Sequence, residues 1–270
     1  MFLPLNVDVP MNRLPIANWG LIAVIAGVSL IAWASPGLFG FLVGYDPPPA
    51  DSGVASDLAR QFAPRVFNPP WWKMPAVAFT ASFVHANILH LAGNLFFLWI
   101  FGNAINYKLG HVGFLGLYSA GAILAGLASY WALPGLACCG ASGAIMCVMG
   151  AFLVFFPRND VEVIAAPFVE FTFWAQTLEL PGWAVMLARV GWDILLLILF
   201  GNEMEDRVGY EAHIAGFVVG FLVAWVLAST RLVQPTRYEE TLLQVLGIHR
   251  VRKDEAYRKE RAAPARRWRL

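Results

Sequence analysis

Ser142 has the sequence surroundings that a nucleophilic serine requires. It lies in the string Gly140-Ala141-Ser142-Gly143, where the glycines leave no side-chain bulk around its hydroxyl. An apolar run follows, so we expect the serine to begin a helix, where free backbone N–H groups and the helix dipole favour a developing oxyanion. This predicts acyl transfer, with Gly140 and Gly143 bordering the substrate. A serine that caps a helix or packs against a neighbour is the alternative explanation.

A general base for this serine stands at the start of a later apolar segment. His213 lies one helical turn before Gly216, which forms a G-x-x-x-G stripe with Gly220. Another helix can dock closely on such a stripe, which would bring its side chains within reach of the imidazole. A weak nucleophile with a base at hydrogen-bond distance is the minimum arrangement for acyl transfer. We therefore predict that Ser142 and His213 are catalytic, the alternative being a lone histidine at the end of a helix.

His90 and Asn94 are spaced four residues apart and so share one face of a helix. Near the depth of Ser142 they could donate hydrogen bonds to an oxyanion, each worth roughly 2.7–4 kcal/mol. They could instead join helices, at about 0.6 kcal/mol per bond. His85 could order the turn that precedes them. No H-E-x-x-H string or nearby carboxylate accompanies these histidines, so we predict neither a metal nor a cofactor.

Arg189 and Asp193 are also four residues apart, within an apolar segment. The simplest explanation is an ion pair inside one helix, with the arginine reaching toward the cytoplasmic face. Asp193 could also be a third catalytic group or a proton-relay residue. Because it should lie deeper in the membrane than Ser142 and His213, the structural explanation is favoured.

Membrane-spanning helices must position these side chains, because the composition does not fit a soluble protein. Of 270 residues, 59% are hydrophobic and 14% are charged, whereas an average globular domain has roughly 25% charged residues. Crossing a bilayer takes about 20 predominantly apolar residues in a helix. Six segments qualify: 19–37, 87–106, 111–132, 141–156, 183–201 and 212–230. We predict an all-α, polytopic membrane protein with six transmembrane helices.

The basic residues predict the orientation of these helices. With the N-terminus in the cytoplasm, the inner segments carry fourteen Lys and Arg residues and the outer segments carry four. This bias follows the positive-inside rule and places both termini in the cytoplasm. The predicted organisation is a cytoplasmic N-terminal segment (1–18), a six-helix membrane domain (19–230) and a basic cytoplasmic tail (231–270). Because no Arg-rich transit peptide is visible, a bacterial inner membrane is the predicted location.

Two parts of this organisation have alternative explanations. The outer segment 38–84 is too long for a simple turn, and its Trp71 and Trp72 suit a segment that lies partly in the headgroup region. A loosely packed extracellular loop would fit equally well. The first span could be a cleaved signal peptide, because Ala32-Trp33-Ala34 resembles a cleavage site, although Arg13 alone makes a weakly positive start.

Three blocks of the sequence, taken together, resemble the rhomboid family of intramembrane serine proteases. They are His85–Gly102 (HANILHLAGNLFFLWIFG), Gly140–Pro157 (GASGAIMCVMGAFLVFFP) and Ala212–Gly220 (AHIAGFVVG). The resemblance implies a six-helix bundle with a water-filled cavity open to the outer face. It also implies a Ser–His dyad without a third, acidic member.

The same resemblance implies roles for individual residues. Ser142 would be the nucleophile and His213 the general base. His90 and Asn94 would join the backbone N–H of Ser142 as oxyanion donors. The two glycines of the G-x-x-x-G stripe, Gly216 and Gly220, would seat the sixth helix against the fourth.

Two features depart from the family pattern. Rhomboids often carry a Trp-Arg pair in the outer loop, and the corresponding positions are Ala76 and Val77, with Trp72-Lys73 out of register. Some members place an aromatic ring four residues after the serine, against the histidine, where this chain has Met146. Neither departure removes the dyad.

The predicted function is intramembrane serine proteolysis near the outer membrane face, by a Ser–His dyad. The predicted partners are single-pass transmembrane protein substrates and membrane lipids, and not nucleic acid. The alternative is a non-catalytic rhomboid-like protein that binds transmembrane helices without cleaving them. A small transporter that uses Arg189 and Asp193 would predict internal repeats with matched broken helices, and the sequence has none.

Overall fold

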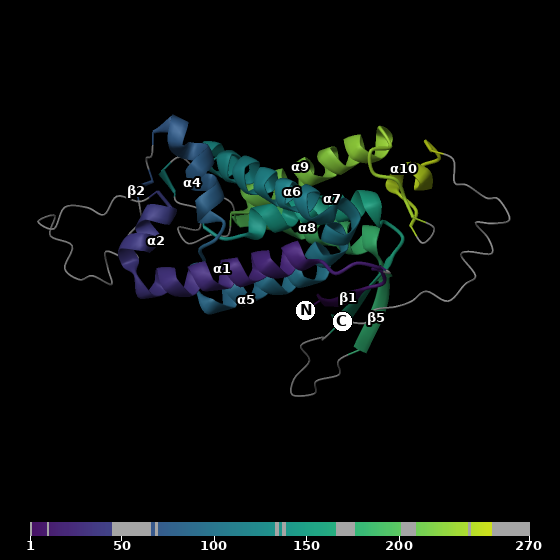
Figure 1. The fold of residues 1–270 in the computed structure, drawn as a ribbon, viewed down its shortest axis with the longest axis horizontal. Coiled ribbons are helices and arrows are strands. Elements are labelled where there is room, and N and C mark those ends of the chain that lie inside the picture. The colour runs from purple at the N-terminus through teal and green to yellow at the C-terminus, as the bar shows by residue number, and fades with distance from the viewer. Residues whose placement is uncertain are drawn as a thin grey trace, which may run out of the picture.

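The computed structural model describes residues 2–9, 11–44, 66–67, 70–132, 135–136, 139–165, 176–200, 209–236 and 239–249. Helices make up most of it, with short strands between them (Figure 1). The elements are β1 (Phe2–Val7), α1 (Ile16–Ala34), α2 (Pro36–Leu42), β2 (Val66–Phe67), η1 (Trp71–Lys73), α4 (Met74–Ala81), α5 (Ile88–Phe97), the π-helix η2 (Leu98–Gly102), α6 (Asn103–Ala132), β3 (Gly135–Leu136), α7 (Ser142–Phe155), β4 (Asp160–Ala165), β5 (Gln176–Pro181), α8 (Gly182–Phe200), α9 (Tyr210–Ser229) and α10 (Leu242–Val245).

Within the described ranges, four helical stretches are long and apolar enough to cross a membrane, as befits an integral membrane protein. They are Ile16–Ala34, Ile88–Ala132, Gly182–Phe200 and Tyr210–Ser229. The second is 45 residues long, or about 68 Å at 1.5 Å per residue, roughly twice the hydrocarbon thickness of a bilayer. It kinks at Gly110, where φ is 73°, between the predicted spans 87–106 and 111–132. All six predicted segments are helical, and the number of membrane crossings stays a prediction.

The short helix α7 lies at the centre of the fold. Its 14 residues are too few to cross a bilayer in the usual way, and every one from Gly143 to Phe155 is buried. Helices α6 and α9 pack against α7 and against each other, and Figure 1 shows α7 among the other helices of the bundle. Protein rather than lipid therefore surrounds this apolar helix, as expected for an interrupted span beside a cavity.

A three-stranded antiparallel sheet at one end of the bundle shows that the predicted all-α class is wrong in part. Its strand order is β1-β4-β5, and β4 pairs Val161 with Val7 of β1 and with Leu180 of β5. Val161 and Val163 are buried, whereas Glu162 between them is half-buried. This alternation is the period of a strand. The sheet ties the N-terminal segment to the connection between α7 and α8.

The predicted outer segment 38–84 contains helices rather than only a loop. Helix α2 lies near its start, and η1 and α4 form its end. Trp71 and Trp72 are 82% and 61% exposed, which suits a headgroup contact that stays a prediction. Residues 45–65 of this segment lie outside the described part of the chain.

The described part of the predicted tail returns to the bundle. Glu239 forms a buried ion pair with Lys108, whose ammonium also donates a hydrogen bond to the Gln234 carbonyl at 2.9 Å. Helix α10 follows and contacts α7 and α9. The basic residues predicted at the end of the tail lie outside the described residues.

Candidate active site

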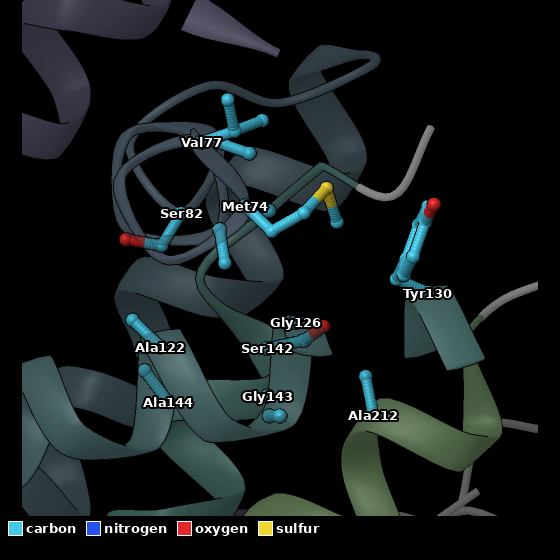
Figure 2. Close-up of a pocket in the computed structure, with 14 residues that line it drawn as sticks. Met74, Val77, Ser82, Ala122, Gly126, Tyr130, Ser142, Gly143, Ala144 and Ala212 are labelled. Carbon is cyan, nitrogen blue, oxygen red and sulfur yellow. The ribbon is translucent and has the colours of Figure 1, made fainter. Parts of the chain in front are cut away.

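Ser142 is the first residue of α7, and its hydroxyl faces a pocket. The side chain is half-buried, and Figure 2 shows it pointing into the space bordered by Met74, Tyr130 and Ala212. The pocket is open to solvent, and the empty space in it and in its mouth together is about 540 Å³. Residues of α4, α6, α7 and the start of α9 line it, and most of them are alanine or glycine. The serine hydroxyl is therefore accessible from outside the bundle.

Backbone N–H groups lie beside this hydroxyl without an acceptor in their own helix. The first hydrogen bond of α7 runs from the Ile145 N–H to the Ala141 carbonyl, at 2.9 Å. The N–H groups of Ser142, Gly143 and Ala144 precede it, and helix geometry gives them no intrahelical partner. Donors at a helix N-terminus stabilise negative charge, so the start of α7 suits an oxyanion.

Glycines bring the backbones of α7 and α9 into direct contact. A Cβ atom on Gly216 would lie 2.0 Å from the Gly143 carbonyl oxygen, and one on Gly220 would lie 1.7 Å from the Cys147 oxygen. A Cβ atom on Gly143 would lie 3.5 Å from the Ala212 oxygen. The G-x-x-x-G stripe thus packs the predicted sixth span against the predicted fourth.

His213 and Ser142 flank this contact between helices. His213 is 3% exposed, and among the described residues its Nε2 atom has no hydrogen-bond partner. The Ser142 hydroxyl and this nitrogen are therefore on neighbouring helices but are not hydrogen-bonded to each other. Without substrate, catalytic hydrogen bonds are often long and tighten only in the complex. An unpaired ring nitrogen beside the serine helix can accept a proton.

Asp193 contacts the predicted general base, although its expected depth in the membrane favoured a purely structural role. Its Oδ2 lies 3.0 Å from Nδ1 of His213, and its Oδ1 forms an ion pair with Arg189. The ion pair predicted within α8 is therefore present, and the same aspartate makes a second contact, with His213. The same carboxylate connects α8 to α9, so the expected difference in depth between Asp193 and His213 does not keep them apart.

Tyr210 places an aromatic ring beside the histidine. The rings of Tyr210 and His213 meet edge to face, with centroids 6.3 Å apart, whereas Met146 is buried in α7. Tyr210 and His213 are three residues apart on α9, a spacing that brings side chains together. That spacing could have revealed the contact in the sequence.

His85 fixes the backbone just before the serine. Its Nε2 accepts a hydrogen bond from the Ala141 N–H at 3.2 Å, so the neutral ring carries its proton on Nδ1, which faces the Ser29 hydroxyl at 3.0 Å. The Ser29 hydroxyl in turn donates to the Phe83 carbonyl. Burial lowers the pKa of His85 to about 3, and the neighbouring His90 adds to the lowering. His85, predicted only to order a turn, therefore connects α1 to the loop that precedes Ser142, residues 139–141.

His90 contacts the same loop, whereas Asn94 bonds within its own helix. Gly140 has φ 118°, and a Cβ atom there would lie 3.1 Å from Nε2 of His90. The Asn94 carboxamide donates to the His90 carbonyl at 3.0 Å, which leaves it one further N–H. Neither His90 nor Asn94 lines the pocket that holds Ser142. Their proposed role as oxyanion donors therefore stays a prediction.

The described residues form a helical membrane protein. It has a serine at the N-terminus of one helix and a histidine on the adjoining helix, as the resemblance to rhomboids implied. The Rhomboid domain family model matches residues 69–230, more than half of the chain. The chain belongs to the rhomboid family. The match includes Ser142 and His213 and leaves out β1 and α1.

Several curated relatives are similar to this chain over part of its length. Rhomboid-like protein 11, chloroplastic, of Arabidopsis thaliana is 30% identical over 161 residues, which are 59% of this chain and 54% of the relative. Rhomboid protein 1, mitochondrial, of Saccharomyces cerevisiae is 31% identical over 155 residues, 55% of this chain and 40% of the relative. Presenilin-associated rhomboid-like protein, mitochondrial, of Homo sapiens is 31% identical over 99 residues, 34% of this chain and 25% of the relative.

These alignments span between a quarter and about half of each relative's own length. The relatives carry the names of mitochondrial and chloroplast proteins. They therefore give no support to the prediction of a bacterial inner membrane.

Proposed function

We propose that this protein is an intramembrane serine protease with Ser142 as its nucleophile and His213 as its general base. The observation that carries the proposal is the contact of the α7 N-terminus with the start of α9, beside an open pocket. The accessible Ser142 hydroxyl and the N–H groups at the start of α7 lie on one side of this contact. On the other side, α9 carries His213, which does not line the pocket and whose Nε2 has no partner among the described residues. Family membership makes proteolysis the chemistry that this arrangement best fits.

The proposed reaction is acyl transfer in two stages. His213 Nε2 takes the proton of the Ser142 hydroxyl as Oγ bonds to the carbonyl carbon of the scissile peptide. The tetrahedral oxyanion accepts hydrogen bonds from the N–H groups at the start of α7, with His90 and Asn94 as candidate additional donors. The amine then leaves with the proton from His213, and water repeats the cycle to release the acid and restore the serine.

The proposed substrate is a transmembrane segment that unwinds near the site. A membrane helix keeps its carbonyls hydrogen-bonded, so attack requires local loss of helical structure. Glycine or proline near the cleavage point reduces that requirement. The alanine and glycine lining of the pocket, closed on two sides by Met74 and Tyr130, suits a small side chain next to the scissile bond.

The proposed topology has six spans, with residues 1–18 and 231–270 on the cytoplasmic side and the pocket toward the outer face. The kink at Gly110 supports two crossings within Ile88–Ala132. The pairing of β1 with β4 supports it as well, because it requires the N-terminal segment and the α7–α8 connection to share one side.

The test compares wild type with Ser142→Ala in detergent, using a panel of single-pass substrates and mass spectrometry of the products. We expect cleavage by wild type and none by the variant. Cleavage that persists in Ser142→Ala would refute the nucleophile assignment. Binding without cleavage by both proteins would favour the alternative function, in which the chain holds transmembrane helices.

A further inference from the structure

A buried carboxylate lies directly behind the proposed general base. Asp193 on α8 is 1% exposed and His213 on α9 is 3% exposed. Oxygen Oδ2 of the aspartate and nitrogen Nδ1 of the histidine are 3.0 Å apart, within hydrogen-bond distance. This contact is separate from the α7–α9 packing and from the residues that line the pocket.

We propose that Asp193 is a positioning residue that acts on the reaction through His213. An ionised carboxylate can only accept hydrogen bonds, so the proton of a neutral His213 ring must lie on Nδ1. Nε2 then carries the lone pair, and this is the nitrogen that has no partner among the described residues. The aspartate therefore selects the tautomer that can accept a proton from Ser142, the role that the acid has in a Ser-His-Asp triad.

Arg189 supports this role by holding the other oxygen of the carboxylate. It pairs with Oδ1, while Oδ2 remains toward the histidine. Each oxygen of the carboxylate therefore has its own partner, and the contact with His213 does not compete with the ion pair. When His213 becomes an imidazolium during the reaction, a counter-charge is already in contact with it.

The inference rests on the proposed proteolytic function and differs from the dyad that the family resemblance implies. A competing explanation is that Asp193 only fastens α8 to α9. In that case its removal would lower stability without changing the turnover of the molecules that remain folded. Turnover and stability must therefore be measured separately.

The experiment uses Asp193→Asn and Asp193→Glu in the full chain, with Glu239→Gln as a matched control. The control makes the same carboxylate-to-carboxamide change in a buried ion pair outside the site. Readouts are kcat per folded molecule, KM for a transmembrane substrate, the rate of Ser142 labelling by a fluorophosphonate, and the melting temperature.

We expect Asp193→Asn to lower kcat by roughly 10²–10⁴-fold with KM little changed, because the amide can donate to Nδ1 and favour the wrong tautomer. Labelling of Ser142 should slow in parallel, and Asp193→Glu should recover part of the loss. Glu239→Gln should lower the melting temperature while kcat stays at the wild-type value.

A wild-type kcat and labelling rate in Asp193→Asn, with a lower melting temperature, would overturn the inference and leave the proposed protease intact. A wild type that neither cleaves nor is labelled at Ser142 would overturn both. If the asparagine variant does not fold, the double variant Arg189→Met with Asp193→Leu replaces the ion pair by apolar side chains, a change that buried pairs often tolerate. The same loss of kcat is expected there, and its absence would refute the inference.

Discussion

Replacing Gly220 by alanine tests whether the α7–α9 contact positions the proposed catalytic pair. A Cβ atom at this position would lie 1.7 Å from the Cys147 carbonyl oxygen, whereas real Cβ atoms essentially never come within 3.0 Å of such an atom. The backbones of α7 and α9 must therefore separate by at least 1.3 Å, the difference between these two distances. The three Cys147 atoms nearest to this Cβ are all backbone atoms, so no flexible side-chain end can move aside instead.

The expected cost follows from packing and conformational terms of opposite sign. Overpacking a well-packed contact costs about 1–3 kcal/mol, and a clash with backbone belongs at the upper end. Replacing a helical glycine by alanine returns roughly 0.5–1 kcal/mol. We expect a net loss of about 2 kcal/mol in the free energy of unfolding. Because a displacement of about 1 Å can reduce a reaction rate by about 10²-fold, kcat should fall by a similar factor.

Gly191→Ala is the matched control, because a Cβ atom at Gly191 in α8 would have no other atom within 4 Å. Thermal unfolding in detergent and kcat on one transmembrane substrate should be measured for both variants. We expect the control to keep the wild-type kcat and to be at least as stable as wild type. If Gly220→Ala matched the control in both measurements, the reasoning that glycine contacts set the distance between Ser142 and His213 would be refuted.

Two further predictions concern buried polar groups away from the α7–α9 contact. Because the folded protein keeps His85 neutral down to a pKa of about 3, while an unfolded histidine takes up a proton below about 6.5, stability should fall as the pH drops between these values. The loss should be about 2 kcal/mol from pH 7 to pH 5, and thermal unfolding of His85→Asn should lack this part of the pH dependence; an unchanged dependence would contradict the assignment. Lys108→Met should cost about 3–5 kcal/mol by leaving Glu239 buried without its partner, and the double variant Lys108→Met with Glu239→Leu should recover most of it in chemical denaturation. Equal stability of the single and double variants would show that the unpaired carboxylate is not the cause.

The sequence predicted those parts of the fold that depend on local patterns. The length of the apolar runs marked every long helix, and the short fourth segment was expected beside a cavity. The spacing of Gly216 and Gly220 predicted a close helix contact. Two glycines on one face let any neighbouring helix approach closely, so the prediction does not require knowing which helix that is. The position of Ser142 at the start of a helix was predicted from Gly140 before it and the apolar run after it.

The parts that the sequence did not reveal depend on pairings between distant residues. Strand β1 pairs Phe2 with Ala165, and no local signal connects a short N-terminal strand to a hairpin more than 150 residues later. The alternation of Val161, Glu162 and Val163 could have marked β4 by itself. Its partners become known only when the helices bring the two chain segments to the same end of the bundle.

The contact between Asp193 and His213, which the predicted depths did not favour, has a geometric explanation. Asp193 lies seven residues before the end of α8 at Phe200, and His213 lies three residues after the start of α9 at Tyr210. These positions differ by four residues, or about 6 Å along a helix axis. From the sequence alone, this difference in depth suggested that the two side chains would not meet. Membrane helices tilt by about 20° on average, and the two side chains add their own reach toward each other. A difference of about 6 Å in the membrane depth expected from the sequence therefore does not exclude contact between two side chains. Asp193 and His213 are such a pair.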